Sequence, residues 1–120
     1  MTRIVLTLAA AGFAAVVLAS SAMAATPRLV ASTGPDGAFR ITLTKGGKKV
    51  TKLKAGKYTI VVKDVARTHN FHLTGPGKLN KKTPVSGKGT FTWHVTLRKG
   101  TYRYVCDPHK TIMKGSFTVT

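Results

Sequence analysis

Three side chains that can bind a soft metal lie within eight residues near the carboxyl end of this 120-residue chain. Cys106 offers a thiolate, His109 an imidazole and Met113 a thioether, and Asp107-Pro108 breaks the strand after Cys106 into a turn. The turn lets Cys106 and His109 converge, although three residues apart on a straight strand they would point to opposite faces. Copper suits this donor set, and a second histidine would complete a trigonal His₂Cys site with a weak axial methionine.

The second histidine has to come from another part of the chain, where three remain: His69, His72 and His94. In the strand expected over 69–74, His69 shares its face with apolar side chains, whereas His72 lies on the polar face. His94 lies opposite the apolar face of its own strand. A single inward histidine is more often a core residue than a ligand, but the three donors downstream favour a metal here. We therefore predict that His69 is the second histidine ligand.

Four protein ligands would fill the coordination sphere of the metal. Catalysis at the metal needs an open position, so a filled site favours simple redox exchange. Cu(I) prefers sulfur donors and Cu(II) prefers nitrogen, and a site between these preferences changes little when the metal is reduced. The donor set is therefore typical of a centre that exchanges single electrons.

Alternating apolar and polar residues predict short β-strands as the elements that position these donors. Residues 90–97 (TFTWHVTL) alternate strictly, and further strands are expected at 29–33, 38–44, 57–63, 69–74, 101–106 and 115–120. Glycine-rich turns separate these segments, and a polar, lysine-rich loop is expected over 78–89. No helical periodicity appears in this region. The pattern predicts an all-β fold, an antiparallel Greek-key β-sandwich of about seven to eight strands.

The first 24 residues have the features of a cleaved secretion signal peptide. Arg3 precedes an apolar run over 4–19, and an Ala-Met-Ala cleavage sequence follows at positions 22–24. The run is shorter than the ~20 residues of a spanning helix, and no charged stop-transfer block follows it directly. We predict cleavage after position 24, no transmembrane segment thereafter, and a single domain over 25–120 that is periplasmic or extracellular.

The cysteine count and the charge give two further constraints. Cys106 is the only cysteine, so an internal disulfide is excluded, and a lone thiol in an oxidising compartment has to be buried or bound. The chain carries 20 Lys and Arg against 3 Asp and Glu. This charge favours anionic partners such as envelope polymers, although plain solubility explains it equally well. Export makes nucleic acid an unsuitable partner, so none is expected.

Two segments resemble the copper-ligand segments of the cupredoxin family. His69-Asn70-Phe71 is similar to the segment that supplies the first ligand in plastocyanin, amicyanin and pseudoazurin. The segment 104–109 (YVCDPH) with a following Met113 resembles their carboxy-terminal ligand loop. The resemblance covers essentially residues 25–120. It implies a type 1 (blue) copper site cycling between Cu(I) and Cu(II), with His69, Cys106 and His109 as equatorial ligands and Met113 as the axial one.

The resemblance also implies roles for neighbouring residues. Asn70 would tie the two ligand segments together by hydrogen bonding near Cys106. Pro108 and Ile112 would belong to an apolar ring around the edge of His109, where electrons leave towards redox partner proteins. Two lysines flank the same loop and would meet acidic groups on such a partner: Lys110 and Lys114. The spacing of three residues between His109 and Met113 is one that varies among these proteins.

Three other interpretations fit parts of the sequence. A carrier or storage protein for copper or zinc could use His72 beside the other donors, but strand parity opposes joint chelation by His69 and His72. A metal-free basic β-sandwich that binds envelope polyanions would make the donor cluster a coincidence. An enzyme with a Cys–His nucleophile is disfavoured, since the chain has three acids and no phosphate-binding loop of the required spacing.

Overall fold

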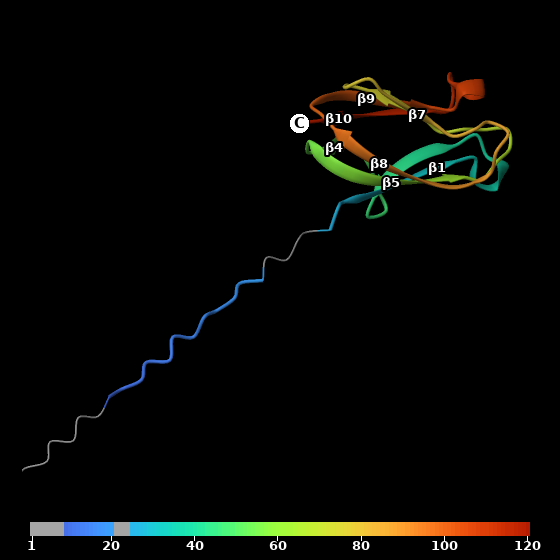
Figure 1. The fold of residues 1–120 in the computed structure, drawn as a ribbon. Helices are drawn as coiled ribbons and strands as arrows, with labels where there is room; N and C mark the ends of the chain where they lie inside the picture. Colours follow the sequence, from blue (N-terminus) through green and yellow to red (C-terminus); the bar gives the residue numbers. More distant parts are fainter. Residues whose placement is uncertain (1–8, 21–24) are drawn as a thin grey trace, which may run out of the picture.

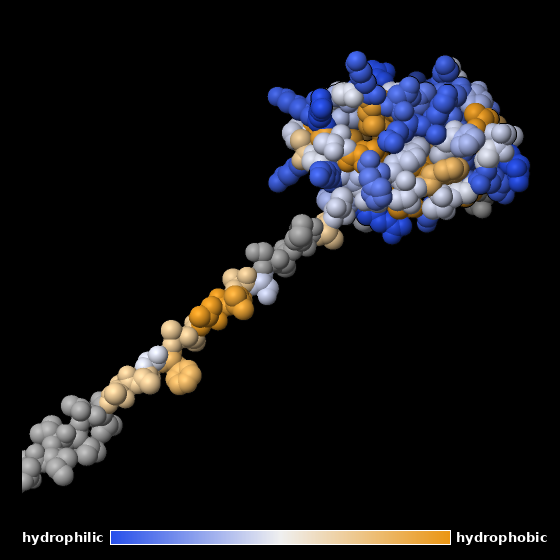
Figure 2. All heavy atoms as spheres, viewed as in Figure 1, coloured by the Kyte–Doolittle hydropathy of each residue, from blue (hydrophilic) through white to orange (hydrophobic). Residues whose placement is uncertain are grey.

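The computed structural model describes residues 9–20 and 25–120, and the second range folds into a β-sandwich (Figure 1). Arg3 and the predicted cleavage sequence at 22–24 lie outside the described residues. Residues 9–20 form neither helix nor strand and expose apolar side chains, in contrast to the largely hydrophilic surface of the sandwich (Figure 2). Among the residues described, no helix is long and apolar enough to cross a membrane.

Ten strands in the described part of the chain form two five-stranded sheets. In the first sheet the order is β3-β2-β1-β5-β8, with bounds Lys48–Lys49, Ile41–Lys45, Arg28–Thr33, Gly56–Asp64 and Gly89–Leu97. In the second the order is β4-β10-β9-β6-β7, with bounds Lys52–Leu53, Lys114–Val119, Gly100–Val105, His72–Gly75 and Leu79–Lys82. Two short 3₁₀ turns complete the fold, η1 at Pro35–Gly37 and η2 at Asp107–His109.

The predicted all-β sandwich is confirmed, with more strands than expected. β3 and β4 have only two residues each, too short to show alternation, and β7 lies inside the segment 78–89 that was expected to be a loop. The sheets are also mixed, because β1 pairs with β5 and β4 pairs with β10 in parallel. Side chains alternate with the same period in parallel and antiparallel strands, so the sequence pattern could not distinguish the two.

The core lies between the two sheets and follows the alternation of the strands. In β8, Val95 and Leu97 are buried while Thr96 between them is exposed, as the pattern of 90–97 predicts. Aromatic rings stack within the core, with ring centroids 5.1 Å apart for Tyr102 and Phe117. Each large apolar side chain buried here stabilises the fold by about 1.5–3 kcal/mol. A rigid sandwich of this kind can hold loops at its ends in fixed positions.

Strand register brings two loops distant in sequence to the same end of the sandwich. Val105, the last residue of β9, pairs with His72 at the start of β6 on one side and with Lys114 at the start of β10 on the other. The loop that precedes β6, residues 65–71, therefore lies beside the loop that joins β9 to β10, residues 106–113. This is the end at which η2 lies in Figure 1, away from the carboxyl terminus.

Candidate metal centre

Three donor atoms from these two loops lie within 4.8 Å of one another, in His69, Cys106 and His109. Nδ1 of His69 lies 3.0 Å from Nδ1 of His109, and Sγ of Cys106 lies 3.6 Å from each of them. A triangle with these sides has a point about 2.0 Å from all three atoms, close to metal–imidazole bonds of ~2.0–2.1 Å and metal–thiolate bonds of ~2.3 Å. The donors therefore already have the spacing that a single metal ion requires.

The loop 106–113 is held by its own backbone. The Cys106 N–H donates to the Met113 carbonyl at 3.0 Å, and the Met113 N–H donates to the His109 carbonyl at 2.8 Å. Pro108 stands at the start of η2 and is exposed, and this turn brings His109 back towards Cys106. The Met113 side chain is completely buried. A thioether is thus enclosed in the same loop that presents the thiolate and one imidazole.

His69 reaches the site from a loop and not from a strand. The expected strand over 69–74 begins only at His72, because the chain turns at residues 67–68. The Asn70 N–H donates to Cys106 Sγ at 3.4 Å and the Phe71 N–H donates to Thr83 Oγ1 at 2.9 Å, so these groups do not continue a sheet ladder. The premise of strand parity is therefore wrong for His69, although its side chain is only 2% exposed and lies beside Cys106.

Asn70 joins the two loops, in the position that the family resemblance implies. The side-chain Nδ2–H of Asn70 donates to the Asp107 carboxylate at 2.8 Å, and the side-chain Oδ1 accepts from the backbone N–H of Asp107 at 2.7 Å. Burial alone would raise the pKa of Asp107, but hydrogen bonds from His72 and Asn70 and the charges of His72 and Lys82 hold this pKa below its usual value. The carboxylate stays ionised and keeps accepting from Asn70, which stabilises the contact between the loops.

Gly34 leaves the space that the His69 ring occupies. A Cβ at this position would lie 2.6 Å from His69 Cδ2 and 2.7 Å from Ala66 Cβ, and φ of Gly34 is +67°. Both the close approach and the left-handed backbone require glycine. The sequence shows only a Gly-Pro-Asp-Gly turn here and carries no sign of contact with a histidine 35 residues downstream.

Phe39 is a second residue of the site that the sequence analysis missed. Its ring lies edge-on to both imidazoles, with centroids 5.3 Å from His69 and 4.9 Å from His109. It is nevertheless 59% exposed, which is unusual for a large aromatic side chain. Phe39 therefore covers the two histidine rings from the solvent side.

The remaining histidines lie outside the donor triangle. His72 Nδ1 lies 2.8 Å from Asp107 Oδ1 and its Nε2 lies 2.6 Å from Asn80 Oδ1, while His94 is exposed on β8. We predict that His72→Ala and His94→Ala leave the visible spectrum of the copper-loaded protein unchanged, since neither ring reaches the donors. Loss of the absorption band in either variant would show that the wrong histidine has been assigned.

Asp64 makes the stability of the metal-free protein depend on pH. It is fully buried, and Oδ2 accepts from the Thr83 hydroxyl at 2.8 Å, while Oδ1 has no hydrogen-bond partner within the described part of the chain. Burial raises the pKa of Asp64, against smaller opposing effects of Thr83, Ala66 and His69. Ionisation of Asp64 therefore opposes folding. The stability that the protonated carboxyl contributes is complete below the unfolded-state pKa of ~3.9 and is lost as pH rises through the folded-state pKa.

The corresponding prediction is that Asp64→Asn removes this loss of stability. Urea unfolding of the metal-free protein and of the variant is measured across the acidic to neutral range. As pH rises, the variant should become more stable relative to the unchanged protein, as measured by the difference between their free energies of unfolding. A difference that stays constant with pH would contradict the assigned shift.

The fold and the donor triangle define a metal protein of the β-sandwich class with one His₂Cys site at the end of the sandwich. The family model described as "copper binding proteins, plastocyanin/azurin family" matches residues 39–120, so the chain belongs to this family. The resemblance to cupredoxins is thereby confirmed, and the cofactor of the family is copper. Comparison with curated proteins gives no match.

Solved cupredoxin structures have the same fold. Reduced rusticyanin is 24% identical with a TM-score of 0.52, over 82% of each chain. A reduced Cu(I) form of an amicyanin variant is 24% identical with a TM-score of 0.51, over 81% of this chain and 86% of amicyanin. Auracyanin A, a blue copper protein from Chloroflexus aurantiacus, is 21% identical with a TM-score of 0.53, over 80% of this chain and 100% of auracyanin.

Proposed function

We propose that this protein is an exported blue-copper electron carrier whose copper is held by His69, Cys106, His109 and, axially, Met113. The observation that carries the proposal is the donor triangle, in which two imidazole nitrogens and one thiolate from distant loops lie 3.0–3.6 Å apart. Bound copper supplies the exchange of one electron between Cu(I) and Cu(II). The donor set fits copper, because thiolate and thioether are soft donors while imidazole suits both oxidation states.

The protein's own contribution is to keep the donors in place. The Cys106 N–H donates to the Met113 carbonyl, which holds the backbone of the loop, and the Asn70 N–H donates to Sγ, which holds the sulfur. This N–H also stabilises negative charge on the thiolate. Because the same positions serve both oxidation states, little reorganisation accompanies electron exchange.

His109 gives the site its access to the surface. Cys106 is 0% and His69 2% exposed, whereas His109 is partly exposed. Apolar side chains surround this end of the molecule, among them Phe39 at 59% and Ile112 at 63% exposed. We infer that a redox partner docks on this apolar end and that the electron passes through the His109 ring.

Lys110 and Lys114 are both exposed beside the same loop. They suit a partner with acidic groups around its docking surface, since opposite charges steer two proteins together and raise the association rate. The rate of electron exchange with such a partner would fall as salt concentration rises. Export is supported by the sequence alone, through the short apolar run over 4–19 and the Ala-Met-Ala sequence at 22–24.

Replacing the axial thioether tests the role of Met113. Met113→Leu should keep the blue colour, because the equatorial donors remain, and should raise the reduction potential, because Cu(II) loses a ligand. We expect a rise of at least about 59 mV, which corresponds to a tenfold change in the preference for Cu(I) in a one-electron couple. The potential is measured by voltammetry of both loaded proteins, and an unchanged value would remove Met113 from the ligands.

The proposed function is tested first by metal content and colour. The purified protein is analysed for bound metal, then loaded with Cu(II), and its visible spectrum is recorded. We expect one copper per chain and an intense thiolate-to-copper absorption band. Bound zinc without colour would favour a zinc carrier, and Cu(II) bound without the band would mean that Cys106 is not a ligand.

A further inference from the structure

A lysine-lined hollow lies at the end of the sandwich opposite the metal centre. Its volume is about 960 Å³, and it is formed mainly by the segment 45–58 together with Pro27 and Thr120. The strand β5 begins in the hollow at Gly56 and ends at Asp64, just before the loop that carries His69. Nine residues of extended strand separate the two ends by roughly 26 Å. The hollow is therefore independent of the copper site.

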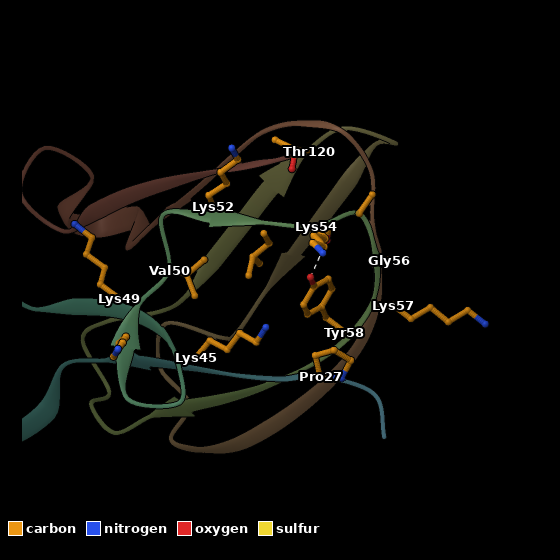
Figure 3. Close-up of a pocket in the computed structure, with 13 residues that line it drawn as sticks. Pro27, Lys45, Lys49, Val50, Lys52, Lys54, Gly56, Lys57, Tyr58 and Thr120 are labelled. Atoms are coloured by element: carbon orange, nitrogen blue, oxygen red, sulfur yellow. Dashed lines mark hydrogen bonds between the residues drawn. The ribbon is translucent and has the colours of Figure 1, made fainter. Parts of the chain in front are cut away.

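Six of its lining residues are lysines: Lys45, Lys48, Lys49, Lys52, Lys54 and Lys57. All six are exposed, and the lining includes no Asp or Glu side chain. The one salt bridge among the described residues, between His72 and Asp107, lies at the other end of the molecule. Lys45 extends across the hollow, whereas Lys49 and Lys57 extend outward at its rim (Figure 3). Six neighbouring positive charges repel one another, so an anion that bridges them would be bound favourably.

We propose that this hollow binds an acidic polysaccharide, whose spaced carboxylates pair with several lysines at once. A small anion would neutralise only one or two of the six charges. Among the residues that the structure describes, no arginine lines the hollow to bind phosphate with two hydrogen bonds. Its aromatic residue, Tyr58, is 5% exposed and donates its hydroxyl to the Lys54 carbonyl at 2.7 Å, so it offers no face on which bases could stack.

The shape of the end also favours a flexible polymer over a lipid surface. A protein that lies on a bilayer normally inserts apolar side chains between the headgroups. The large exposed apolar side chains of the folded domain are Phe39, Val65, Val85 and Ile112, and none of them lines the hollow. Lysines spread around a concave surface can instead meet a bent polymer chain from several sides. A protein held in this way would leave its copper end free for redox partners.

The test compares two triple variants of equal net charge. Lys48, Lys52 and Lys57 are changed to glutamine in the hollow variant, and the exposed Lys78, Lys88 and Lys99, which lie outside it, are changed to glutamine in the control. Binding to alginate oligosaccharides is measured by calorimetry between about 50 and 200 mM NaCl, with neutral dextran of equal length as a blank. Thermal unfolding and the copper spectrum, measured on the same samples, check that the fold and the metal site are intact.

We expect the hollow variant to bind alginate at least about tenfold more weakly and with a smaller salt dependence, and the control to stay within about twofold of the unchanged protein. Equal weakening in both variants would mean that only net charge matters and would overturn the proposal. Absence of alginate binding would overturn it as well. So would tighter binding, through the same lysines, to phosphatidylglycerol vesicles or to single-stranded DNA. In each case an unchanged copper spectrum would leave the proposed electron-carrier function standing.

Discussion

Cys106→Ser should abolish the blue absorption band of the copper-loaded protein. The band arises from charge transfer between a thiolate sulfur and Cu(II), and Cys106 Sγ is the thiolate within 3.6 Å of both His69 and His109. A serine hydroxyl is a hard and poorly ionised donor, so the remaining two imidazoles would bind Cu(II) weakly and without this band. The visible spectrum of both proteins after copper loading gives the measurement.

The serine variant needs a control for folding, since Cys106 is fully buried. Serine is close to cysteine in size, so the β-sandwich should form, and far-UV circular dichroism of the metal-free variant checks this. His94→Ala serves as a control variant, because its histidine is exposed on β8 and does not belong to the donor cluster. A folded Cys106→Ser protein that stays blue would refute the assigned ligand.

Gly34→Ala should damage the copper site more than any other single-methyl addition to this turn. The new Cβ would lie 2.6 Å from His69 Cδ2, so the imidazole would have to move out of the donor triangle. The left-handed backbone costs alanine about 1–2 kcal/mol, and overpacking of a filled space typically costs about 1–3 kcal/mol more. We expect a loss of about 2–5 kcal/mol in unfolding free energy, with weaker copper binding and an altered visible band.

Gly37→Ala is the matched control. Gly37 has nearly the same backbone conformation, with φ of +73°, but an added Cβ would meet nothing within 4 Å. This variant should therefore lose only the ~1–2 kcal/mol of the backbone term and keep the copper affinity and spectrum. Urea unfolding and copper titration of both variants give the comparison. Equal effects at the two positions would mean that close contact with His69 is not the reason why position 34 requires glycine.

The part of the site that sequence could predict is the part that is local. Cys106, His109 and Met113 share one loop, and the turn at Asp107-Pro108 brings the donor atoms of Cys106 and His109 together. The sandwich was predictable for a similar reason, since residue alternation directly reports a half-buried strand. His69 lies beside this loop, but it gets there from a loop of its own, and the strand on which its choice rested starts three residues later.

What could not be predicted depends on contacts between distant segments. Phe39 contacts two histidines that lie 30 and 70 residues downstream, and neither its type nor its spacing indicates an exposed ring over a metal site. The need for glycine at Gly34 has the same origin. The parallel pairing of β1 with β5 depends on where the chain changes sheets, which the alternation of side chains does not record.

The lysine-lined hollow gathers six of the chain's 20 Lys and Arg residues at one end of the sandwich. The sequence shows six lysines over 45–57, but on the sequence alone they could have covered any solvated face. The fold gathers them at one end, where β4, the start of β5 and the carboxyl end of β10 meet (Figure 1). An electron carrier that binds a polymer at one end and redox partners at the other would keep its copper end accessible to those partners while the polymer holds the protein.

Voltammetry of the copper-loaded protein, with the visible spectrum recorded at each potential, tests electron transfer most directly. We expect a reversible one-electron wave, together with a blue band that bleaches on reduction and returns fully on reoxidation without loss of copper. An irreversible wave, or release of copper on reduction, would contradict it and would point to a protein that delivers or stores the metal.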